Sequence, residues 1–494
     1  MCFSQSNRDA RQRRVCFLVG SLVFMLTGGS LLAQARQAAP SSTQPGKVFR
    51  AGASTSVITP KLGVSMQGSL QDRKATHVHD ELHARCIVLD DGTTRLAIAV
   101  MDNCMLPLDV AEAAKKRAHE LTKIPVENMM LSATHTHSSP TTGPVFQSEA
   151  DPDYLRFLSE RIADAIQVAC NNLVPAKIGW GVGSEPNQVF NRRWMMKPGS
   201  VTNPFGGKTD QATMNPGFAN PDRLKPAGPT DPEVPVVALQ SLDGRPIGIL
   251  ANYSLHYVGG TRSGDISADY YGMFADRLEK MVGSDEAFPP LVAIMSNGTS
   301  GDVNNANSGV KPTPLPPYAK MRQVANALAA EAYKVYQNIQ YQAWVPLGSQ
   351  QTQIRLGVRK PTPEDLTRAR GVVSRAKGPT MVTMEEAYAR ETLLIVDYPD
   401  QVPVILQAFR IGDLAITAIP CEVFVEIGLE LKKRSPFKTT FNHELANGYN
   451  GYLPTPEQHA LGGYETWRAR SAYLEVGAAP KITETLLELL NKLK

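Results

Sequence analysis

One apolar run of this chain ends in a His-x-His pair and is then stopped by a proline: Leu131-Ser132-Ala133-Thr134-His135-Thr136-His137-Ser138-Ser139-Pro140. If residues 128–135 form an extended strand, its period of two sends His135 and His137 to the same side. Two imidazoles that converge on one point suit a borderline metal such as zinc. Two histidines on one strand face can also simply donate hydrogen bonds, so the choice depends on the rest of the chain.

Two more apolar runs end at a side chain that could bind a metal or take part in catalysis. His256 closes the run 248–257, and open α/β sheets place their sites at the carboxyl ends of strands. Glu422 follows Pro420-Cys421, where a strand gives way to a helical pattern. Each has a structural alternative, because His256 can be a hydrogen-bonded core residue and Glu422 can cap the helix start.

Two polar segments complete the set of candidates. The loop 296–305 contains Asp302 and two glycines, which either let the backbone approach a ligand or only turn the chain. A tyrosine- and glycine-rich segment, residues 448–465, contains Tyr452 and Tyr464 twelve residues apart.

The composition is that of a globular protein with an ample core, since 42% of the 494 residues are hydrophobic and only 20% are charged. The net charge of +4 is small and no basic stripe alternates with aromatic residues, which argues against nucleic-acid binding. Short β-branched runs alternate with helical patterns from Val48 onward. This order predicts an α/β fold with a mixed β-sheet core flanked by helices, in a single catalytic domain over residues 48–494.

The element predictions rest on apolar periodicity and on capping residues. A helix is expected to begin near Thr362, with Thr362 as its N-cap and Pro363 behind it. The other segments are strands at 95–101, 291–295, 404–410 and 414–419, and helices at 154–172, 319–337 and 482–493.

The first 35 residues have the layout of a secretory signal. Arginines precede the apolar stretch 15–32, and Ala33-Gln34-Ala35 offers a small-x-small cleavage site. A retained membrane anchor is the alternative, because the stretch approaches the ~20 residues that span a bilayer. Its glycines and the cleavage site favour a signal peptide cut near Ala35, and therefore a secreted or periplasmic protein.

The mature chain keeps four cysteines, Cys86, Cys104, Cys170 and Cys421, without a Cys-x-x-Cys pair. Cys86 and Cys104 lie on apolar segments that could be neighbouring strands, so a disulfide between them is one of the pairings that export would permit.

Residues 195–235 and 308–318 are rich in glycine and proline and are expected to be irregular. The first is either an insertion over an active site or a disordered surface loop.

Together these segments resemble the catalytic domain of the neutral/alkaline non-lysosomal ceramidases, which are zinc-dependent hydrolases of an N-acyl amide bond. The resemblance spans most of the mature chain, beginning with Gly52-Ala53-Ser54-Thr55-Ser56-Val57-Ile58-Thr59-Pro60. Its most specific parts are the His-x-His-Ser segment and the tyrosine pair.

The resemblance implies a role for each matching residue. The zinc ligands would be His135, His256, Glu422 and Tyr452. His137 and Tyr464 would stabilise the tetrahedral oxyanion, a contribution on the order of 3 kcal/mol per donor. Such a nitrogen and oxygen ligand set can hold zinc and leave a place for water, whose pKa zinc lowers toward ~7. Asp302 would remain as an acid or base.

The sequence departs from the family in two places. Asn304 stands where ceramidases usually carry a serine at the reaction centre, and an amide cannot act as a hydroxyl nucleophile. The additional C-terminal β-sandwich of typical members is not expected in this chain.

Three hypotheses follow. The first is an exported zinc amidohydrolase acting on ceramide or a related N-acyl lipid, with peripheral membrane contact as one consequence. The second keeps the zinc site and assigns another amide or ester substrate. The reason for considering it is that Asn304 replaces the serine of the family. The third is an inactive binding protein on the same fold. The sequence does not indicate an oligomeric state.

Overall fold

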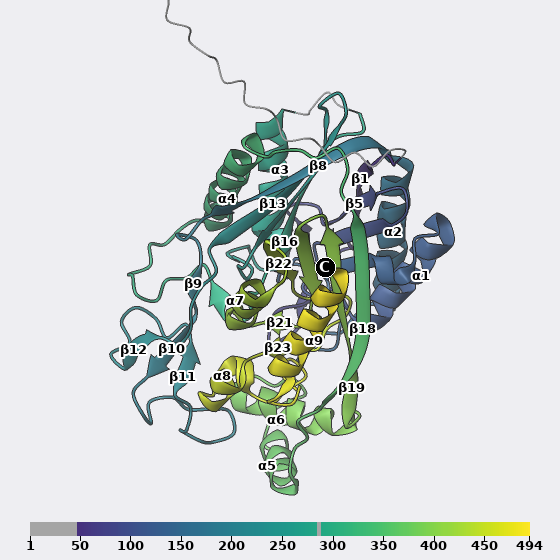
Figure 1. Ribbon diagram of the computed structural model, residues 1–494. Helices are drawn as coiled ribbons and strands as arrows, with labels where there is room; N and C mark the ends of the chain where they lie inside the picture. The colour runs from purple at the N-terminus through teal and green to yellow at the C-terminus, as the bar shows by residue number, and fades with distance from the viewer. Residues whose placement is uncertain (1–46, 284–287) are drawn as a thin grey trace, which may run out of the picture. The chain divides into compact units, whose positions relative to one another are not determined.

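Two stacked β-sheets form the centre of the protein, and helices cover their outer faces, in a computed structural model that describes residues 47–283 and 288–494 (Figure 1). From Lys47 onward these residues belong to one compact unit. The predicted signal sequence lies outside the described residues. Within them, no helix combines the length and the apolar character that crossing a bilayer requires.

The larger sheet has eight strands in the order β16-β14-β13-β8-β1-β5-β6-β7. Its outer face is covered by α1 (Leu108–Thr122) and α2 (Pro152–Asn171) over one half and by α3 (Asp269–Val282) and α4 (Ala319–Gln337) over the other. The strands are β1 (Arg50–Val57), β5 (His83–Asp90), β6 (Arg95–Met101), β7 (Met129–Ala133), β8 (Val174–Ser184), β13 (Glu233–Ser241), β14 (Pro246–Tyr253) and β16 (Val292–Asn297).

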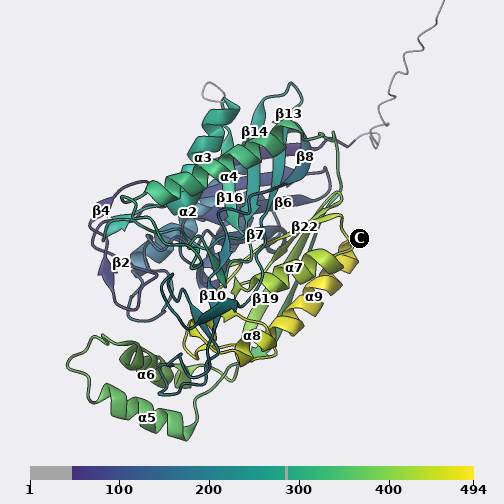
Figure 2. The same cartoon turned by 90° about the vertical axis from the view of Figure 1, so that its left-hand side faces the viewer.

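The smaller sheet has four strands in the order β18-β19-β20-β22. Helices α7 (Val425–Arg434) and α9 (Ala478–Leu493) cover its outer face. Its strands are β18 (Leu347–Gly357), β19 (Gln401–Ile411), β20 (Leu414–Ala418) and β22 (Thr439–His443). Between β18 and β19 the chain leaves the sheets to form α5 (Pro363–Val373) and α6 (Met384–Leu394), which project at the lower left of Figure 2.

Alternating side chains of one strand serve two cores. Along β5, Cys86 and Val88 face the helices, whereas Ile87 and Leu89 face the smaller sheet. Phe409 and Phe441 of the smaller sheet complete that inner core. A strand buried on both faces is apolar at nearly every position, which explains why these strands appear in the sequence as continuous apolar runs.

The twist of the larger sheet brings its two edges together. Five antiparallel and two parallel ladders connect β7 at one edge of the sheet to β16 at the other. Because the number of antiparallel ladders is odd, the two edge strands would run in opposite directions if the sheet were flat. Neighbouring strands turn by roughly 20 to 25° each, which accumulates to nearly half a turn over the sheet. As a result β16 also contacts β5, β6 and β7, and the segments that follow β7 and β14 bring His135 and His256 together.

Short ladders and turns arrange the loops at that end. These elements are β2 (Ser65–Met66) with β3 (Arg73–Lys74), β4 (His77–Val78) with β15 (Asp265–Ile266), β9 (Phe190–Asn191) with β17 (Val303–Asn304), β10 (Arg193–Met196) with β11 (Ala212–Met214) and β12 (Arg223–Pro226), β21 (Glu422–Val423) with β23 (Tyr452–Leu453), the helix α8 (Pro456–Ala460), and the 3-10 turns η1 (Val126–Asn128), η2 (Ile395–Asp397) and η3 (Tyr464–Thr466).

The fold class is confirmed as α/β with a mixed sheet flanked by helices. The helix predicted at 319–337 agrees with α4 at both ends, and Thr362 forms the N-cap of α5 in a capping box with Asp365. Strands 95–101, 404–410 and 414–419 correspond to β6, β19 and β20.

Three expectations are corrected. Strand β7 ends at Ala133, and His135 has a φ of 77°, so the chain is no longer extended at the first histidine. The cysteines are free: Cys86 pairs across β5 and β6 with Ala99, while Cys104 lies beyond the end of β6. Residues 195–235 are not irregular throughout, because they contribute β11, β12 and part of β10 to a three-stranded sheet.

Candidate metal centre

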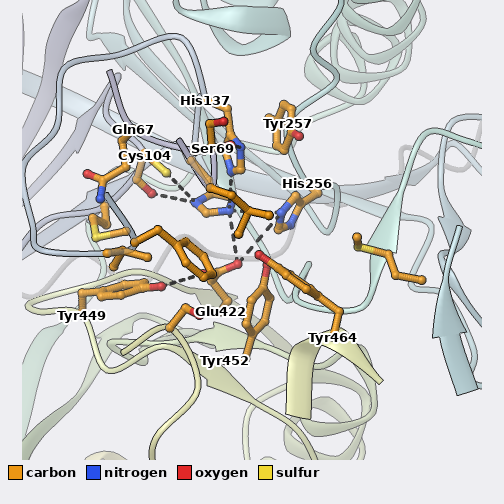
Figure 3. A pocket seen from close by; sticks show the side chains of 18 of the residues that line it. Gln67, Ser69, Cys104, His137, His256, Tyr257, Glu422, Tyr449, Tyr452 and Tyr464 are labelled. Atoms are coloured by element: carbon orange, nitrogen blue, oxygen red, sulfur yellow. Dashed lines mark hydrogen bonds and ion pairs between the residues drawn. The ribbon is translucent and has the colours of Figure 1, made fainter. Parts of the chain in front are cut away.

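Three histidine rings point their Nε2 atoms at one small region (Figure 3). Nε2 of His135 lies 3.1 Å from Nε2 of His256 and 3.2 Å from Nε2 of His137. His135 and His256 are each only 2% exposed. The convergence of His135 and His137 does not come from strand periodicity. It comes from the left-handed backbone at His135, a conformation that is rare outside glycine and concentrated at functional sites.

Backbone carbonyls fix the tautomer of each ring. Nδ1 of His135 donates to the carbonyl of Cys104 at 2.6 Å, Nδ1 of His256 to that of Ser300 at 3.1 Å, and Nδ1 of His137 to that of Gly68 at 3.1 Å. Because a carbonyl oxygen only accepts, the hydrogen of each neutral ring is on Nδ1. All three Nε2 atoms therefore face the same region as lone-pair acceptors.

A strand ladder brings the carboxylate and the phenol to the same place. Glu422 of β21 and Tyr452 of β23 are direct partners in a parallel ladder. Oε2 of Glu422 lies 3.3 Å from Nε2 of His135 and 3.9 Å from Nε2 of His256. Burial raises the pKa of Glu422, but His135, Tyr452 and Tyr449 outweigh it and hold that pKa below its usual value. Glu422 is therefore a charged acceptor.

These residues fit a cation. Oε2 of Glu422 is buried without a hydrogen-bond partner, and the Nε2 atoms beside it have no donor between them. Acceptors that meet in a buried space repel one another unless a positive charge lies among them. Two imidazoles and one carboxylate, with a phenol beside them, are a donor set that suits zinc.

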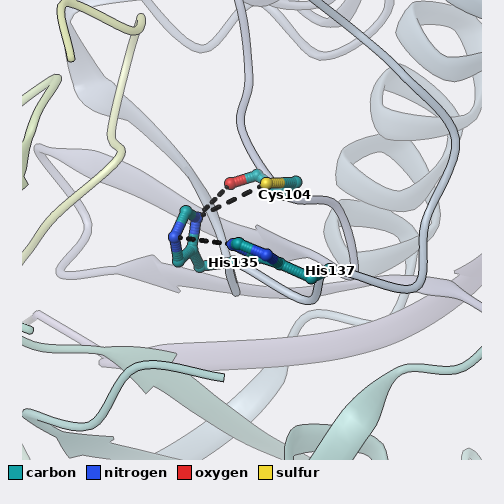
Figure 4. Close-up of side chains that lie close together, drawn as sticks. All are labelled: Cys104, His135 and His137. Atoms are coloured by element: carbon teal, nitrogen blue, oxygen red, sulfur yellow. Dashed lines mark hydrogen bonds between the residues drawn. The ribbon is translucent and has the colours of Figure 1, made fainter. Parts of the chain in front are cut away.

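A second group of side chains shares His135 and could hold an ion only through Nε2 of that ring, the same atom that faces Glu422. Cys104, His135 and His137 lie close together, with Sγ of Cys104 at 3.7 Å from Nδ1 of His135 (Figure 4). That nitrogen carries the hydrogen given to the Cys104 carbonyl, so it has no lone pair for a second ion. Among the groups found in the described residues, His135, His256 and Glu422 therefore form the better centre.

The centre lies at the base of a cavity of about 250 Å³. Tyr464 and Tyr452 line one side, with ring centroids 5.9 Å apart, and Tyr257 stacks on His137 at 3.6 Å on another. The apolar part of the lining consists of Leu70, Met105, Val145, Phe146, Met214 and Met384, of which Met384 is 40% exposed and marks the mouth. Met214 comes from the segment 195–235, so that segment does reach the site.

Comparison with known proteins agrees with this geometry. Residues 49–313, more than half of the chain, match the family model described as neutral/alkaline non-lysosomal ceramidase, N-terminal. The chain belongs to the neutral/alkaline non-lysosomal ceramidase family. The matched part of the chain contains His135, His137 and His256, whereas Glu422 and both tyrosines lie beyond it.

Two solved structures of ceramidases share the fold. The neutral ceramidase from Pseudomonas aeruginosa is 20% identical, with a TM-score of 0.69 over 90% of this chain and 74% of that one. A ceramidase complexed with C2 is 19% identical, with a TM-score of 0.69 over 90% of this chain and 75% of that one. The likeness therefore extends past the family match and over the segments that carry Glu422 and the tyrosines.

Arg192 is a cavity residue that the sequence patterns did not reveal. Its Nη2 donates to Oη of Tyr452 at 3.1 Å, and its Nε donates to Glu465 at 2.9 Å. It is nearly fully buried and lines the cavity. The sequence did contain an indication of this role. Arg192 and Arg193 follow the short apolar pair Val189-Phe190, and two arginines buried beside such a pair need buried acidic partners.

Asp302 and Asn304 are not among the residues that line the cavity of this ceramidase-family protein. The Asp302 carboxylate accepts from Asn191 Nδ2 and from the amide of Val425, both at 2.8 Å. Burial and Glu426 raise its pKa to about 8. Asn304 donates to Asn215 and accepts from the amide of Ala306. Both side chains hold neighbouring loops together, and their assignment to the reaction centre remains a prediction from the resemblance alone.

Glu444 is a second residue that the sequence analysis missed. Its Oε2 accepts from the amides of Val423 at 2.7 Å and Ser300 at 3.0 Å, and its Oε1 accepts from the Ser300 hydroxyl at 2.5 Å. Ser300 supplies the carbonyl that orients His256, and Val423 follows Glu422. One fully buried carboxylate thus fixes the backbone behind two candidate ligands. The rule that identified His256, a polar residue just after a strand, would also have found Glu444, which follows β22.

We expect N304S to leave the rate and the substrate preference unchanged, because Asn304 contacts Asn215 and Ala306 instead of the cavity. The lost amide contact should cost about 1 kcal/mol of stability. Steady-state kinetics on any N-acyl substrate that the wild-type protein hydrolyses provides the measurement. A clear change in selectivity would show that this loop reaches the substrate after all.

We expect E444Q to weaken zinc binding about 10- to 100-fold, as removal of an outer-shell partner typically does. Glutamine keeps one oxygen for the amides of Val423 and Ser300, but it loses the negative charge and the acceptor of the Ser300 hydroxyl, so the supports of His256 and Glu422 would weaken. Competition with a chelator measures the affinity, and E488Q, a change at an exposed glutamate of α9, is the matched control. If E444Q lowers only the unfolding free energy of the metal-free protein and leaves zinc affinity unchanged, Glu444 supports the fold alone.

Proposed function

We propose that this protein is an exported zinc-dependent amidohydrolase that cleaves the N-acyl amide bond of ceramide or of a related N-acyl lipid. The observation that carries the proposal is the meeting of His135, His256 and Glu422 as buried acceptors at the base of a cavity, in a chain of the ceramidase family.

The zinc would be held by Nε2 of His135, Nε2 of His256 and Oε2 of Glu422, with the hydroxyl of Tyr452 as a fourth candidate. Zinc bound there supplies a Lewis acid that polarises the amide carbonyl and acidifies water. Burial and Glu422 hold the pKa of Tyr452 well above its usual value, although Arg192, which donates to its Oη, opposes them, so Tyr452 would bind as a neutral phenol. The guanidinium also fixes the position of that ring.

The remaining residues would move protons and bind oxygen. With Nδ1 donating to Gly68, Nε2 of His137 can take a proton from the attacking water and afterwards donate it. Tyr464 keeps its hydroxyl hydrogen, since burial holds its pKa above the usual value, so it can donate to the carbonyl oxygen as charge develops there. Hydrolysis then breaks the C–N bond, the nitrogen leaves as an amine with the transferred proton, and the acyl group leaves as a carboxylate.

The apolar wall supports an acyl chain as the neighbour of the reacting amide. Leu70, Val145, Phe146 and Met384 line the same cavity as the candidate metal ligands, and Met384 is the most exposed of them. A pocket with apolar walls and a few convergent polar groups is typical of a site for a mainly apolar ligand. The structurally similar ceramidase was solved in complex with C2, which is in keeping with this substrate class.

Export is proposed from the sequence alone. The charged start, the apolar stretch 15–32 and the cleavage motif ending at Ala35 support a secreted or periplasmic location.

A second candidate is a zinc hydrolase of a smaller amide or ester. The specific observation is the cavity volume of about 250 Å³, which falls below the roughly 300 to 1,000 Å³ of most ligand pockets. A long acyl chain would then have to extend past the mouth, whereas a short N-acyl amide would be enclosed.

We expect the purified protein to bind about one zinc per chain. H135A and H256A should lose both the metal and the hydrolytic activity, because each removes one ligand. Elemental analysis after dialysis and an N-acyl hydrolysis assay give the two readouts. H119A, on the exposed face of α1, is the matched histidine control and should keep both. A metal-free preparation with full activity would contradict the proposal.

We expect hydrolysis of both a long-chain ceramide and a short-chain N-acyl amide, with the long chain favoured in kcat/KM because its tail gains contact with the apolar wall. Release of fatty acid, followed by mass spectrometry, measures both. Turnover of the short amide alone would support the second candidate. Turnover of neither by a zinc-loaded protein would leave the inactive binding protein as the remaining hypothesis.

A further inference from the structure

We propose that the tip of the α5–α6 hairpin, residues 370–384, docks this protein on the surface of an anionic phospholipid bilayer, beside the mouth of the cavity. This inference deepens the proposed function and rests on it in one respect: docking would serve to turn the mouth of the cavity toward the bilayer that contains the lipid substrate. The contact itself is argued from the charge, exposure and attachment of the hairpin.

The tip of the hairpin carries three exposed cations that form no ion pair within the described residues. From Leu366 to Met384 the chain has four basic residues and no acidic one, in a protein whose net charge is only +4. Arg370, Arg375 and Lys377 are exposed, and none of the three takes part in the ion pairs of the described residues. For a group of this kind, every one to two cations raise the affinity for an anionic membrane about tenfold.

Four acids flank this segment, Glu364, Asp365, Glu385 and Glu386, and two of them form ion pairs with other arginines: Asp365 pairs with Arg468 at 2.8 Å. Glu385 pairs with Arg368 at 2.8 Å. Glu386 accepts from the amides of Val382 and Thr383 at 2.8 and 3.0 Å, completing the capping box at the start of α6. Arg370 and Arg375 are therefore the cations without an acidic neighbour, while Lys377 lies near enough to Glu386 to contribute, after the amides of Thr383 and Val382, to the lowered pKa of that carboxyl.

Apolar side chains lie next to these cations and face outward. Val382 is 68% exposed and Met384 is 40% exposed. Exposed apolar residues flanked by lysine and arginine are the combination by which peripheral segments bind a bilayer: the cations approach the headgroups and the apolar side chains enter the interface. A nucleic acid would use the cations but would gain nothing from Val382. We therefore commit to the lipid surface.

The tip is attached to the wall of the cavity. Gln147 accepts from the amide of Met381 at 2.7 Å and donates to the carbonyl of the same residue at 2.9 Å. Met384 is both exposed and part of the cavity lining. Further along α6, Tyr388 is buried between Phe146 and Trp467. These contacts hold the hairpin in a fixed place at the mouth, and Figure 2 shows it projecting from the body.

The test compares binding to vesicles of phosphatidylglycerol mixed with phosphatidylcholine and to vesicles of phosphatidylcholine alone. Sedimentation of the full mature chain with vesicles gives the affinity. We expect R370S/R375S/K377S to weaken binding to the anionic vesicles on the order of a hundredfold and to remove its dependence on salt. V382S should weaken it about tenfold through the loss of one buried apolar side chain.

The matched control is K116S/K433S/K438S, which removes three exposed lysines from α1, from α7 and from the segment after it. It should bind vesicles like the wild type. Hydrolysis of a soluble short N-acyl amide, measured in parallel, should be unchanged in all of these variants, because none of the substituted residues is part of the metal centre.

Three results would overturn the docking proposal: equal binding to both kinds of vesicle, equal loss in the lysine control and the hairpin variant, or a DNA duplex that displaces the anionic vesicles from the hairpin at the same salt concentration. Absence of hydrolysis on every N-acyl substrate would instead remove the proposed function. Vesicle binding is a separate readout, so the two failures are distinguishable.

Discussion

The structure depends on one electrostatic constraint: several buried acceptor atoms must lie next to one another. Nε2 of His135 lies within 3.3 Å of Nε2 of His256 and of Oε2 of Glu422, and no hydrogen-bond donor separates them. Such an arrangement costs free energy unless a cation balances it. Other contacts of the fold hold these acceptors in place: backbone carbonyls bind each ring at its Nδ1 atom, and the ladder of β21 and β23 positions the carboxylate.

The supports of the centre are themselves buried polar groups, which makes the region stiff. Glu444 binds three donors behind His256 and Glu422, while Arg192 and Arg193 share Glu465 on the other side. A buried charge without its partner is costly, so these pairs hold their loops in one arrangement. The left-handed backbone of His135 is tolerated for the same reason, because the surrounding contacts fix it.

The outer part of the molecule has a different character. Part of the cavity wall is apolar, and the α5–α6 hairpin beside the mouth combines unpaired cations with exposed apolar side chains. A substrate with an apolar tail and a polar linkage would find apolar contacts and the acceptors in one cavity.

Local sequence determined the elements and most of the candidate residues. Apolar periodicity defined α4 to the residue, and polar side chains after apolar runs identified His135, His256 and Glu422, because burial leaves a direct trace in residue type. The disposition of these residues could not be obtained in this way. Strand β7 ends before His135, the twist of eight strands brings the segments that follow β7 and β14 together, and Asp302 and Asn304 turn to other loops. Arg192 acts through Tyr452 and Glu465, and Glu444 acts in part through Ser300, and all three partners are more than a hundred residues away in the chain. Such contacts depend on packing between distant segments, which local residue patterns do not encode, so only the tertiary structure decided which side chains share the cavity.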